Sequence, residues 1–260
     1  MIHLLFERLR QKQRTLDYPQ EAPALSERFS GRPVLDSSKC KEGCKACLQS
    51  CPTQAIAGEG KRPTLTLDLG RCLFCTECVT ACPERAIAFT PDFRLATTTR
   101  EDLVIREGRT QTLAHALEKK MLRLFGRSLR LRQVSAAGCN GCEVEVNVLQ
   151  TVVFDLARFG IEFVSSPRHA DGLIITGPVS QAMKEPLLKT WEAMPEPKIV
   201  IAVGACAISG GPYMDHPEVL NGPSALLPVD LFIPGCPPHP MTILDGLLRL
   251  LNRLEPHATR

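Results

Sequence analysis

The chain has 260 residues, of which 44% are hydrophobic, and a formal net charge of +3. This length accommodates two domains, and the hydrophobic share is ordinary for a globular protein. So small a charge gives no indication of nucleic-acid binding, and no apolar run approaches the roughly 18 residues that span a bilayer. Charged residues interrupt the apolar N-terminal stretch at once, which is not a signal-peptide pattern. We therefore expect a cytoplasmic protein, whose cysteines bind metal rather than form disulfides.

Residues 1–35 are predicted to form an N-terminal docking arm. The arm opens with an amphipathic stretch that contains Leu4, Leu5, Phe6 and Leu9, and it then becomes polar and rich in proline. Docking on a partner subunit and partial disorder of the terminus are both compatible with this pattern.

The twelve cysteines divide into three sets of four. The sets are Cys40, Cys44, Cys47 and Cys51; Cys72, Cys75, Cys78 and Cys82; and Cys139, Cys142, Cys206 and Cys236. Four thiolates are what one cubane iron–sulfur cluster requires. The sequence therefore predicts three [4Fe–4S] clusters and a role in electron transfer.

Residues 36–95 contain an internal repeat and are predicted to form a two-cluster α+β domain. The stretch 51–57, Cys-Pro-Thr-Gln-Ala-Ile-Ala, is echoed by 82–88, Cys-Pro-Glu-Arg-Ala-Ile-Ala, with an extended segment at 61–68 between them. Each half is interpreted as a cysteine-rich turn, a short helix and a strand.

The second set has the spacing Cys-x2-Cys-x2-Cys-x3-Cys-Pro, which resembles the two-cluster bacterial ferredoxins. In that pattern three neighbouring thiolates surround one cluster and the fourth ligates the other cluster. The resemblance implies that cluster 1 is held by Cys40, Cys44, Cys47 and Cys82, and cluster 2 by Cys51, Cys72, Cys75 and Cys78. The first set departs from the pattern, because three residues separate Cys40 from Cys44 and Gly43 must accommodate the insertion. A three-iron cluster without Cys40 and a pair of zinc sites are the alternatives.

Residues 96–127 are predicted to be a linker with a basic helix. Apolar residues recur at helical spacing from Leu113 to Leu124, with Lys119, Lys120 and Arg123 between them. A solvated linker helix and a surface for a negatively charged partner or membrane both remain open.

Residues 128–260 alternate strand and helix patterns, which favours a flavodoxin-like parallel sheet with helices on both faces. Strands are predicted at 128–134, 161–164, 173–176, 199–203 and 229–233, and helices at 143–159, 186–193 and 241–251. Cys139 and Cys142 follow the first of these strands, Cys206 follows the fourth and Cys236 the fifth. Functional loops of such sheets lie at the carboxyl ends of the strands, so the third set is predicted to converge on cluster 3. Glycines beside these cysteines let backbone N–H groups approach the cluster sulfurs.

Residues 128–251 resemble the small subunit of energy-converting [NiFe]-hydrogenases, including formate hydrogenlyase, and the 20 kDa subunit of NADH:quinone oxidoreductase. The resemblance rests on the segments 166–171, Ser-Pro-Arg-His-Ala-Asp, 204–206, Gly-Ala-Cys, and 234–238, Pro-Gly-Cys-Pro-Pro. It implies an electron-transfer subunit of an oxidoreductase complex, with no complete active site on this chain, that is peripheral on the inner face of the cell membrane. The implied partners are a catalytic large subunit of the hydrogenase or 49 kDa type and other peripheral and membrane subunits.

The spacing Cys139-x2-Cys142 resembles hydrogenase small subunits, whereas quinone-reducing enzymes typically have adjacent cysteines at this position. We therefore predict a hydrogenase or formate hydrogenlyase-like complex, with a quinone-linked complex lacking hydrogenase activity as the alternative. A zinc-stabilised interaction module and a mobile ferredoxin are further hypotheses. Glu143, beside a predicted ligand, is a candidate for a proton path, or else a first-turn carboxylate favoured by the helix dipole. Arg168 and His169 either lie over the third cluster or make structural hydrogen bonds.

Overall fold

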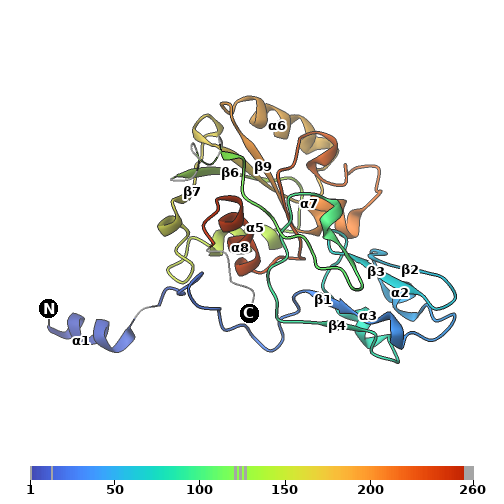
Figure 1. The fold of residues 1–260 in the computed structure, drawn as a ribbon. Coiled ribbons are helices and arrows are strands. Elements are labelled where there is room, and N and C mark those ends of the chain that lie inside the picture. Colours follow the sequence, from blue (N-terminus) through green and yellow to red (C-terminus); the bar gives the residue numbers. More distant parts are fainter. Residues whose placement is uncertain (1, 13, 120–121, 123–124, 126–127, 255–260) are drawn as a thin grey trace.

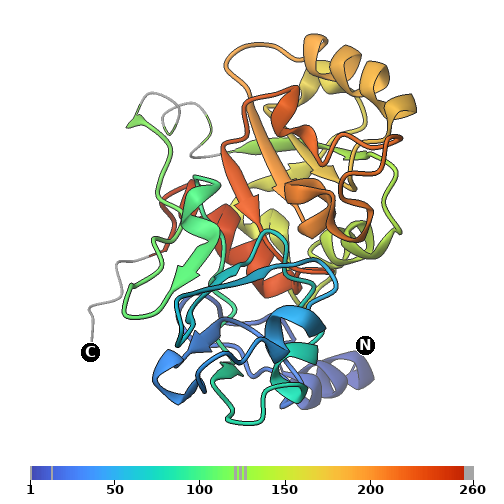
Figure 2. The same cartoon turned by 90° about the vertical axis from the view of Figure 1, so that its right-hand side faces the viewer.

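The computed structural model describes the chain except for residues 1, 13, 120–121, 123–124, 126–127 and 255–260. Two modules lie side by side, and an N-terminal helix, α1 (Ile2–Gln11), stands away from both (Figure 1). In the view of Figure 2, the cysteine-rich N-terminal module lies below and the larger sheet module above it.

The N-terminal module is built from short antiparallel strands and two short helices. Its elements are β1 (Pro33–Leu35), α2 (Ala46–Ser50), β2 (Ile56–Glu59), β3 (Thr64–Asp68), α3 (Glu77–Thr80), β4 (Ile87–Phe89) and β5 (Val104–Arg106). β1 pairs with β4, and β2, β3 and β5 form a second sheet in that order. Each half of the repeat thus supplies a cysteine loop, a helix and a strand, as the sequence predicted. Strand pairing also recruits β1 and β5, which lie outside residues 36–95.

The second module contains a five-stranded sheet in which every pairing is parallel. Its strands are β6 (Leu129–Ser135), β7 (Ile161–Phe163), β8 (Gly172–Thr176), β9 (Ile199–Val203) and β10 (Leu231–Ile233). The order β10-β9-β8-β6-β7 is the flavodoxin-like order, and the strand sequence reverses direction between β6 and β8. The predicted fold class is therefore confirmed.

Helices cover both faces of this sheet because its strands are apolar on both sides. Ile174 and Ile201 belong to the core under α5 (Gly141–Val148) and α8 (Pro240–Leu250). Leu173 and Val200, one residue away, pack on the other face with α6 (Gln181–Glu192). This alternation follows from the period of two along a strand. A further helix, α7 (Ala205–Ser209), follows β9 directly.

The predicted helix at 143–159 is shorter in the structure, and α5 ends at Val148. The Thr151 hydroxyl donates to the Val148 carbonyl at 2.8 Å, and Asp155 adopts a left-handed backbone with φ 46°. From Leu149 to Thr151 the backbone N–H groups donate to carbonyls three residues back instead of four, beside the Thr151 hydroxyl bond, and a 3-10 turn over Leu156–Phe159 follows. Local side-chain bonds of this kind compete with the helical backbone.

The predicted linker helix does not form over residues 113–118, whereas Lys119, Leu122 and Phe125 are helical and the Leu122 N–H donates to the Glu118 carbonyl at 2.9 Å. The N–H groups of Ala114 and Leu117 donate to the carbonyls of Ala96 and Leu250 instead, at 2.7 and 3.0 Å. These tertiary partners hold the segment against the sheet module. Residues 120, 121, 123 and 124 of the predicted helix lie outside the described residues.

The two modules share one hydrophobic core. Leu67, Leu69 and Leu103 of the N-terminal module pack in one cluster with Ala207, Ile208 and Phe232 of the sheet module. The Ser209 hydroxyl donates to the Gly70 carbonyl at 2.8 Å, and Thr97 and Phe232 exchange two backbone hydrogen bonds of 3.0 and 2.8 Å. A shared core and backbone pairing fix the orientation of one module on the other.

Truncation of Ile208 to Ala tests this coupling. Ile208 is 4% exposed and lies at the junction, so its loss is expected to cost about 2–5 kcal/mol of unfolding free energy. Thermal melts followed by far-ultraviolet circular dichroism and by visible absorption of the holoprotein should shift together. Val34→Ala, at a side chain that is 47% exposed, is the control with little effect. Visible absorption that melts at the wild-type temperature in Ile208→Ala would contradict a shared core.

Candidate iron–sulfur sites

The two Cys-Pro turns of the N-terminal module adopt the same local geometry. Cys51 Sγ accepts a hydrogen bond from the Ala55 N–H, and Cys82 Sγ accepts one from the Ala86 N–H, both at 3.2 Å. Both turns also share a left-handed residue two positions before the strand that follows. This residue is Gln54 before β2 and Arg85 before β4, and its φ is 51° in each case. N–H groups aimed at sulfur stabilise a thiolate and its cluster, so both turns fit a ligand role.

Cys82 joins the cysteines of the first run. Burial raises the pKa of the Cys47 thiol, and the neighbouring thiols of Cys82, Cys40 and Cys44 raise it further. Burial also raises the pKa of Cys40, and Cys82 and Cys44 raise it further. These four thiols are therefore mutual electrostatic neighbours, in the combination predicted for cluster 1.

Cys51 joins the second run in the same way. Burial raises the pKa of Cys72 to about 12, against a lowering by the Phe74 N–H, and Cys78, Cys51 and Cys75 raise it further. Burial raises the pKa of Cys78 to about 11, with contributions from Cys51, Cys75 and also Cys47. The second group matches the set predicted for cluster 2, and the proximity of Cys47 to Cys78 shows that the two groups adjoin.

The irregular spacing after Cys40 leaves this thiol within the first group. Gly43 has φ +72°, and Phe74, its counterpart before Cys75, has a left-handed φ of 55°, so both loops share this backbone conformation. The extra residue is taken up by a turn in which the Cys44 N–H donates to the Lys41 carbonyl at 3.2 Å.

The third group converges at the carboxyl edge of the parallel sheet. Cys139 and Cys142 follow β6, Cys206 lies in α7 after β9, and Cys236 follows β10. Burial raises the pKa of Cys206 to about 11, and Cys236 and Cys139 raise it further. The pKa of Cys142 is raised by burial and then by Cys206 and Cys236. Three loops that are distant in sequence thus bring four thiols together, next to the point where the strand order reverses.

Two glycines leave room for sulfur atoms in this third group. At Gly204, with φ +91°, a Cβ atom would lie 2.4 Å from Cys142 Sγ. At Gly211, with φ +55°, it would lie 2.9 Å from Cys206 Sγ. A side chain at either position would collide with a sulfur atom, and the backbone conformation itself favours glycine.

Glu143 is buried beside this group, with 5% of its surface exposed. Its Oε1 accepts hydrogen bonds from the hydroxyls of Ser135 and Thr176, both at 2.6 Å. The carboxylate thus ties the first turn of α5 to the ends of β6 and β8. No sequence pattern indicated these two hydroxyl partners, because they come from separate strands.

Arg168 and His169 lie away from the cysteines. They occupy a 3-10 turn, Pro167–His169, that precedes the amino end of β8, whereas the cysteine loops follow the carboxyl ends of the strands. Both side chains are exposed. A position over the third group, one of two interpretations of the sequence, does not agree with this topology.

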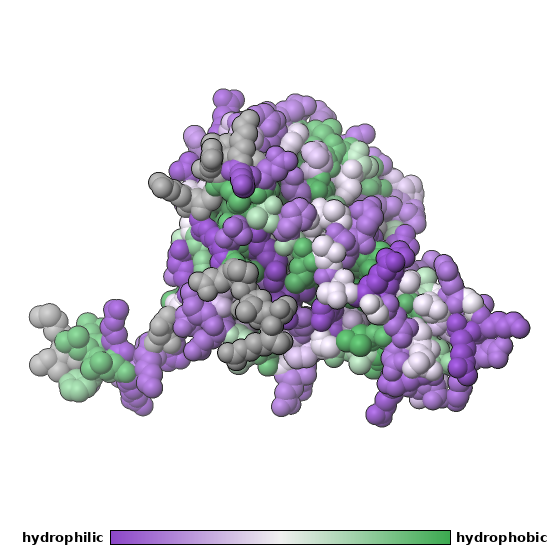
Figure 3. Space-filling model, in the orientation of Figure 1, coloured by the Kyte–Doolittle hydropathy of each residue, from purple (hydrophilic) through white to green (hydrophobic). Residues whose placement is uncertain are grey.

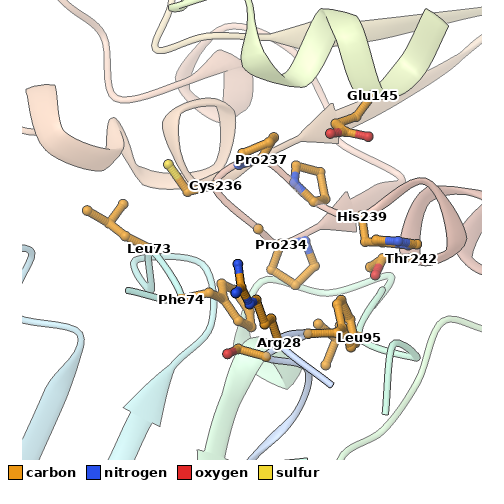
Figure 4. Close-up of a pocket in the computed structure, with 14 residues that line it drawn as sticks. Arg28, Leu73, Phe74, Leu95, Glu145, Pro234, Cys236, Pro237, His239 and Thr242 are labelled. Atoms are coloured by element: carbon orange, nitrogen blue, oxygen red, sulfur yellow. The ribbon is translucent and has the colours of Figure 1, made fainter. Parts of the chain in front are cut away.

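The second and third groups face each other across the junction between the modules. Burial raises the pKa of Cys236, and the thiols of Cys139 and then Cys75 raise it further. Leu73 and Phe74 beside Cys75, together with Cys236 and His239, line a cavity of about 270 Å³ (Figure 4). The three groups therefore follow one another in space as first, second and third, an order that depends on tertiary packing.

The residues present fit iron–sulfur clusters. Among the described residues, no three cysteine, histidine or carboxylate side chains form a group suited to a single metal ion. A cubane cluster does not need several ligands around one ion, because each thiolate binds a separate iron atom at one corner of the cube. The three groups of four thiols have that arrangement. In the N-terminal module, N–H groups donate to the sulfur atoms, and in the sheet module, glycines leave space for the sulfur atoms.

These features define an iron–sulfur protein with a ferredoxin-like module and a flavodoxin-like module. Comparison with known families agrees with both parts. Residues 28–86 match the 4Fe-4S dicluster domain, and residues 139–250 match the family described as NADH ubiquinone oxidoreductase, 20 Kd subunit.

Individual relatives extend this result. Formate hydrogenlyase subunit 7 of Escherichia coli is 44% identical over 140 residues, 54% of this chain and 55% of that protein. The probable membrane-bound hydrogenase subunit mbhJ of Pyrococcus furiosus is 43% identical over 141 residues, 53% of this chain and 84% of that protein. An NADH-quinone oxidoreductase subunit of Rubrobacter xylanophilus is 46% identical over 115 residues, 44% of this chain and 46% of that protein.

The chain therefore belongs to the family of the 20 kDa subunit of NADH:ubiquinone oxidoreductase, whose relatives include subunits of hydrogenase complexes. It spans about half the length of the Escherichia coli relative and most of the Pyrococcus one. A chain in the structure of the membrane-bound sulfane sulfur reductase, an archaeal respiratory membrane complex, is 35% identical, with a TM-score of 0.46 over 55% of this chain and 78% of that chain. None of the described helices is both long and apolar enough to cross a membrane.

Gly204→Ala is expected to remove the third cluster alone, because the new methyl group would lie 2.4 Å from Cys142 Sγ. Iron analysis should fall by about four atoms per chain. The matched control is Gly108→Ala, since Gly108 lies outside the cysteine loops and also has a positive φ, of +69°, but nothing lies within 4 Å of its Cβ position. Equal iron content in the two variants would contradict the assignment of Gly204 to this site.

Proposed function

We propose that this chain is the electron-transfer subunit of a multisubunit, membrane-associated oxidoreductase and carries three [4Fe–4S] clusters. Cluster 1 would be held by Cys40, Cys44, Cys47 and Cys82, cluster 2 by Cys51, Cys72, Cys75 and Cys78, and cluster 3 by Cys139, Cys142, Cys206 and Cys236. The observation that carries the proposal is the sorting of all twelve thiols into three groups of electrostatic neighbours. When bound, such clusters exchange single electrons, while the chain holds and insulates them.

The spatial order of the groups supports a linear order of the three clusters along the electron path. The proximity of Cys47 to Cys78 and of Cys75 to Cys236 supports cluster 2 as the middle member. Cluster 1 is then the outer end, and cluster 3 is the end that serves the partner. The proposed domains are an arm at 1–35, a two-cluster domain at 36–95, a linker at 96–127 and a 20 kDa-like domain at 128–260.

A catalytic large subunit is the proposed partner at cluster 3. Cys139 is exposed, and Val144, on the first helix after it, is 48% exposed. An exposed thiol in a proposed cluster site fits a position that a partner covers. The other peripheral and membrane subunits of the complex would hold this chain at the inner face of the cell membrane.

A hydrogenase or formate hydrogenlyase-like complex is favoured over a quinone-linked complex I-like oxidoreductase without hydrogenase activity. The Cys139-x2-Cys142 spacing supports the first, as do the relatives named for formate hydrogenlyase and membrane-bound hydrogenase, which match over 140 and 141 residues. The NADH-quinone oxidoreductase relative of Rubrobacter matches over 115 residues.

Iron and acid-labile sulfide in anaerobically purified protein test the cluster count. About twelve of each per chain are expected. Cys40→Ala is expected to lower the iron by one or more atoms, and Glu42→Ala, in the same loop, to leave it unchanged. Unchanged iron in Cys40→Ala would remove this thiol from cluster 1. Zinc in place of iron would contradict the whole proposal.

Glu143→Gln tests a proton path. The amide keeps an oxygen that accepts from Ser135 and Thr176, so cluster content and folding should be unchanged, while proton transfer through a carboxyl group is lost. If Glu143 carries protons, turnover of the assembled complex should fall about 10²-fold or more. Unchanged turnover with intact clusters would leave Glu143 only its structural role.

A further inference from the structure

The N-terminal helix α1 presents a large apolar surface that nothing in the described part of the chain covers. Leu4, Leu5, Phe6 and Leu9 are 75, 61, 67 and 73% exposed. Among the other large apolar side chains of the described residues, only Val152 is similarly exposed, at 68%. Figure 3 shows that α1 stands off the body and carries hydrophobic residues together with hydrophilic ones.

Basic residues accompany this apolar surface. Arg8 and Arg10 lie on α1, Lys12 and Arg14 follow it, and Glu7 is the single acidic residue of this segment. Among the described residues, the side-chain pairs of α1 are internal, from Gln11 and Arg10 to Glu7. The segment is therefore amphipathic and positively charged, and its charge is not neutralised by the body of the protein.

The chain just after α1 is fastened to the sheet module. The Thr15 hydroxyl donates to the Val152 carbonyl at 2.8 Å, and the Leu16 N–H donates to the Val153 carbonyl at 2.9 Å. Arg158 donates to the Leu16 carbonyl at 2.6 Å. Two residues farther on, the Tyr18 hydroxyl donates to the buried Asp245 at 2.7 Å. The helix thus leaves the body at a fixed place, beside the exposed side chains of Val152 and Val153.

We propose that α1 lies in the interface of an anionic lipid membrane and anchors this chain there directly. A ten-residue helix is about 15 Å long, half of what is needed to span the hydrocarbon core, so it would lie in the plane of the membrane. An apolar face with arginines beside it is the pattern of interfacial helices. The occupant is lipid rather than a protein groove because four basic side chains complement phosphate headgroups, and the apolar and charged features are confined to α1 and the residues just after it.

The test is flotation of the full chain, with its clusters loaded, on vesicles of phosphatidylglycerol and phosphatidylcholine, compared with phosphatidylcholine alone. Binding to the anionic vesicles is expected, with weakening as salt is raised. Arg8→Gln with Arg10→Gln should lower the partition coefficient about fivefold for each charge removed. Leu5→Gln with Leu9→Gln should abolish binding, because it removes apolar surface from the helix.

Val34→Gln is the matched control, since Val34 is 47% exposed on the other module and should not affect flotation. Visible absorption of the clusters in every variant reports that the body has folded. Failure of the cluster-loaded wild-type chain to float with anionic vesicles would overturn the proposal and would favour a protein partner for α1. Wild-type flotation in the Leu5→Gln, Leu9→Gln variant would also overturn it, because another surface would then be responsible. The iron content of the chain is independent of either outcome.

Discussion

The contact between α7 and the loop after β3 fixes the relation of the two modules, and the proposed electron path depends on it. Ile208 and Ser209 of α7 meet Gly70, where a Cβ atom would come within 2.7 Å of Ile208. Cys72 and Cys75 follow this loop directly, and Cys206 lies in the same helix as Ile208. One tight junction therefore places a loop of the second thiol group against the third group. A loosened junction would separate them without changing any single group.

Burial favours the protonated form of these thiols in the absence of a cluster. It raises the pKa of Cys72 to about 12 and of Cys206 to about 11, so the thiols by themselves would be protonated at neutral pH. Iron binds the thiolate form. The positive charge of the iron atoms offsets the repulsion and desolvation cost of several thiolates in one buried group. Cluster assembly and the completed fold of the cysteine loops are thus expected to be linked.

The sequence predicted the main architecture of both modules and which cysteines lie near one another along the chain. The repeat around Cys51 and Cys82 indicated a ferredoxin-like module, and cysteines after three strands indicated a site at the carboxyl edge of a parallel sheet. It did not reveal that Cys75 and Cys236 adjoin, or that Ser135 and Thr176 bind Glu143, because such contacts join distant segments through packing. One helix length was also predicted wrongly: the apolar pattern continues past Val148, where α5 ends and backbone hydrogen bonds to carbonyls three residues back follow.

The proposed electron path depends most on the position of cluster 2 between clusters 1 and 3. Electron paramagnetic resonance of the fully reduced chain tests it through magnetic coupling between neighbouring clusters. We expect strong coupling of cluster 2 to both others. We also expect that Gly204→Ala, without cluster 3, leaves one coupled pair from the N-terminal module. Coupling between clusters 1 and 3 that exceeds their coupling to cluster 2, or a cluster 3 signal isolated from both, would contradict the proposed order.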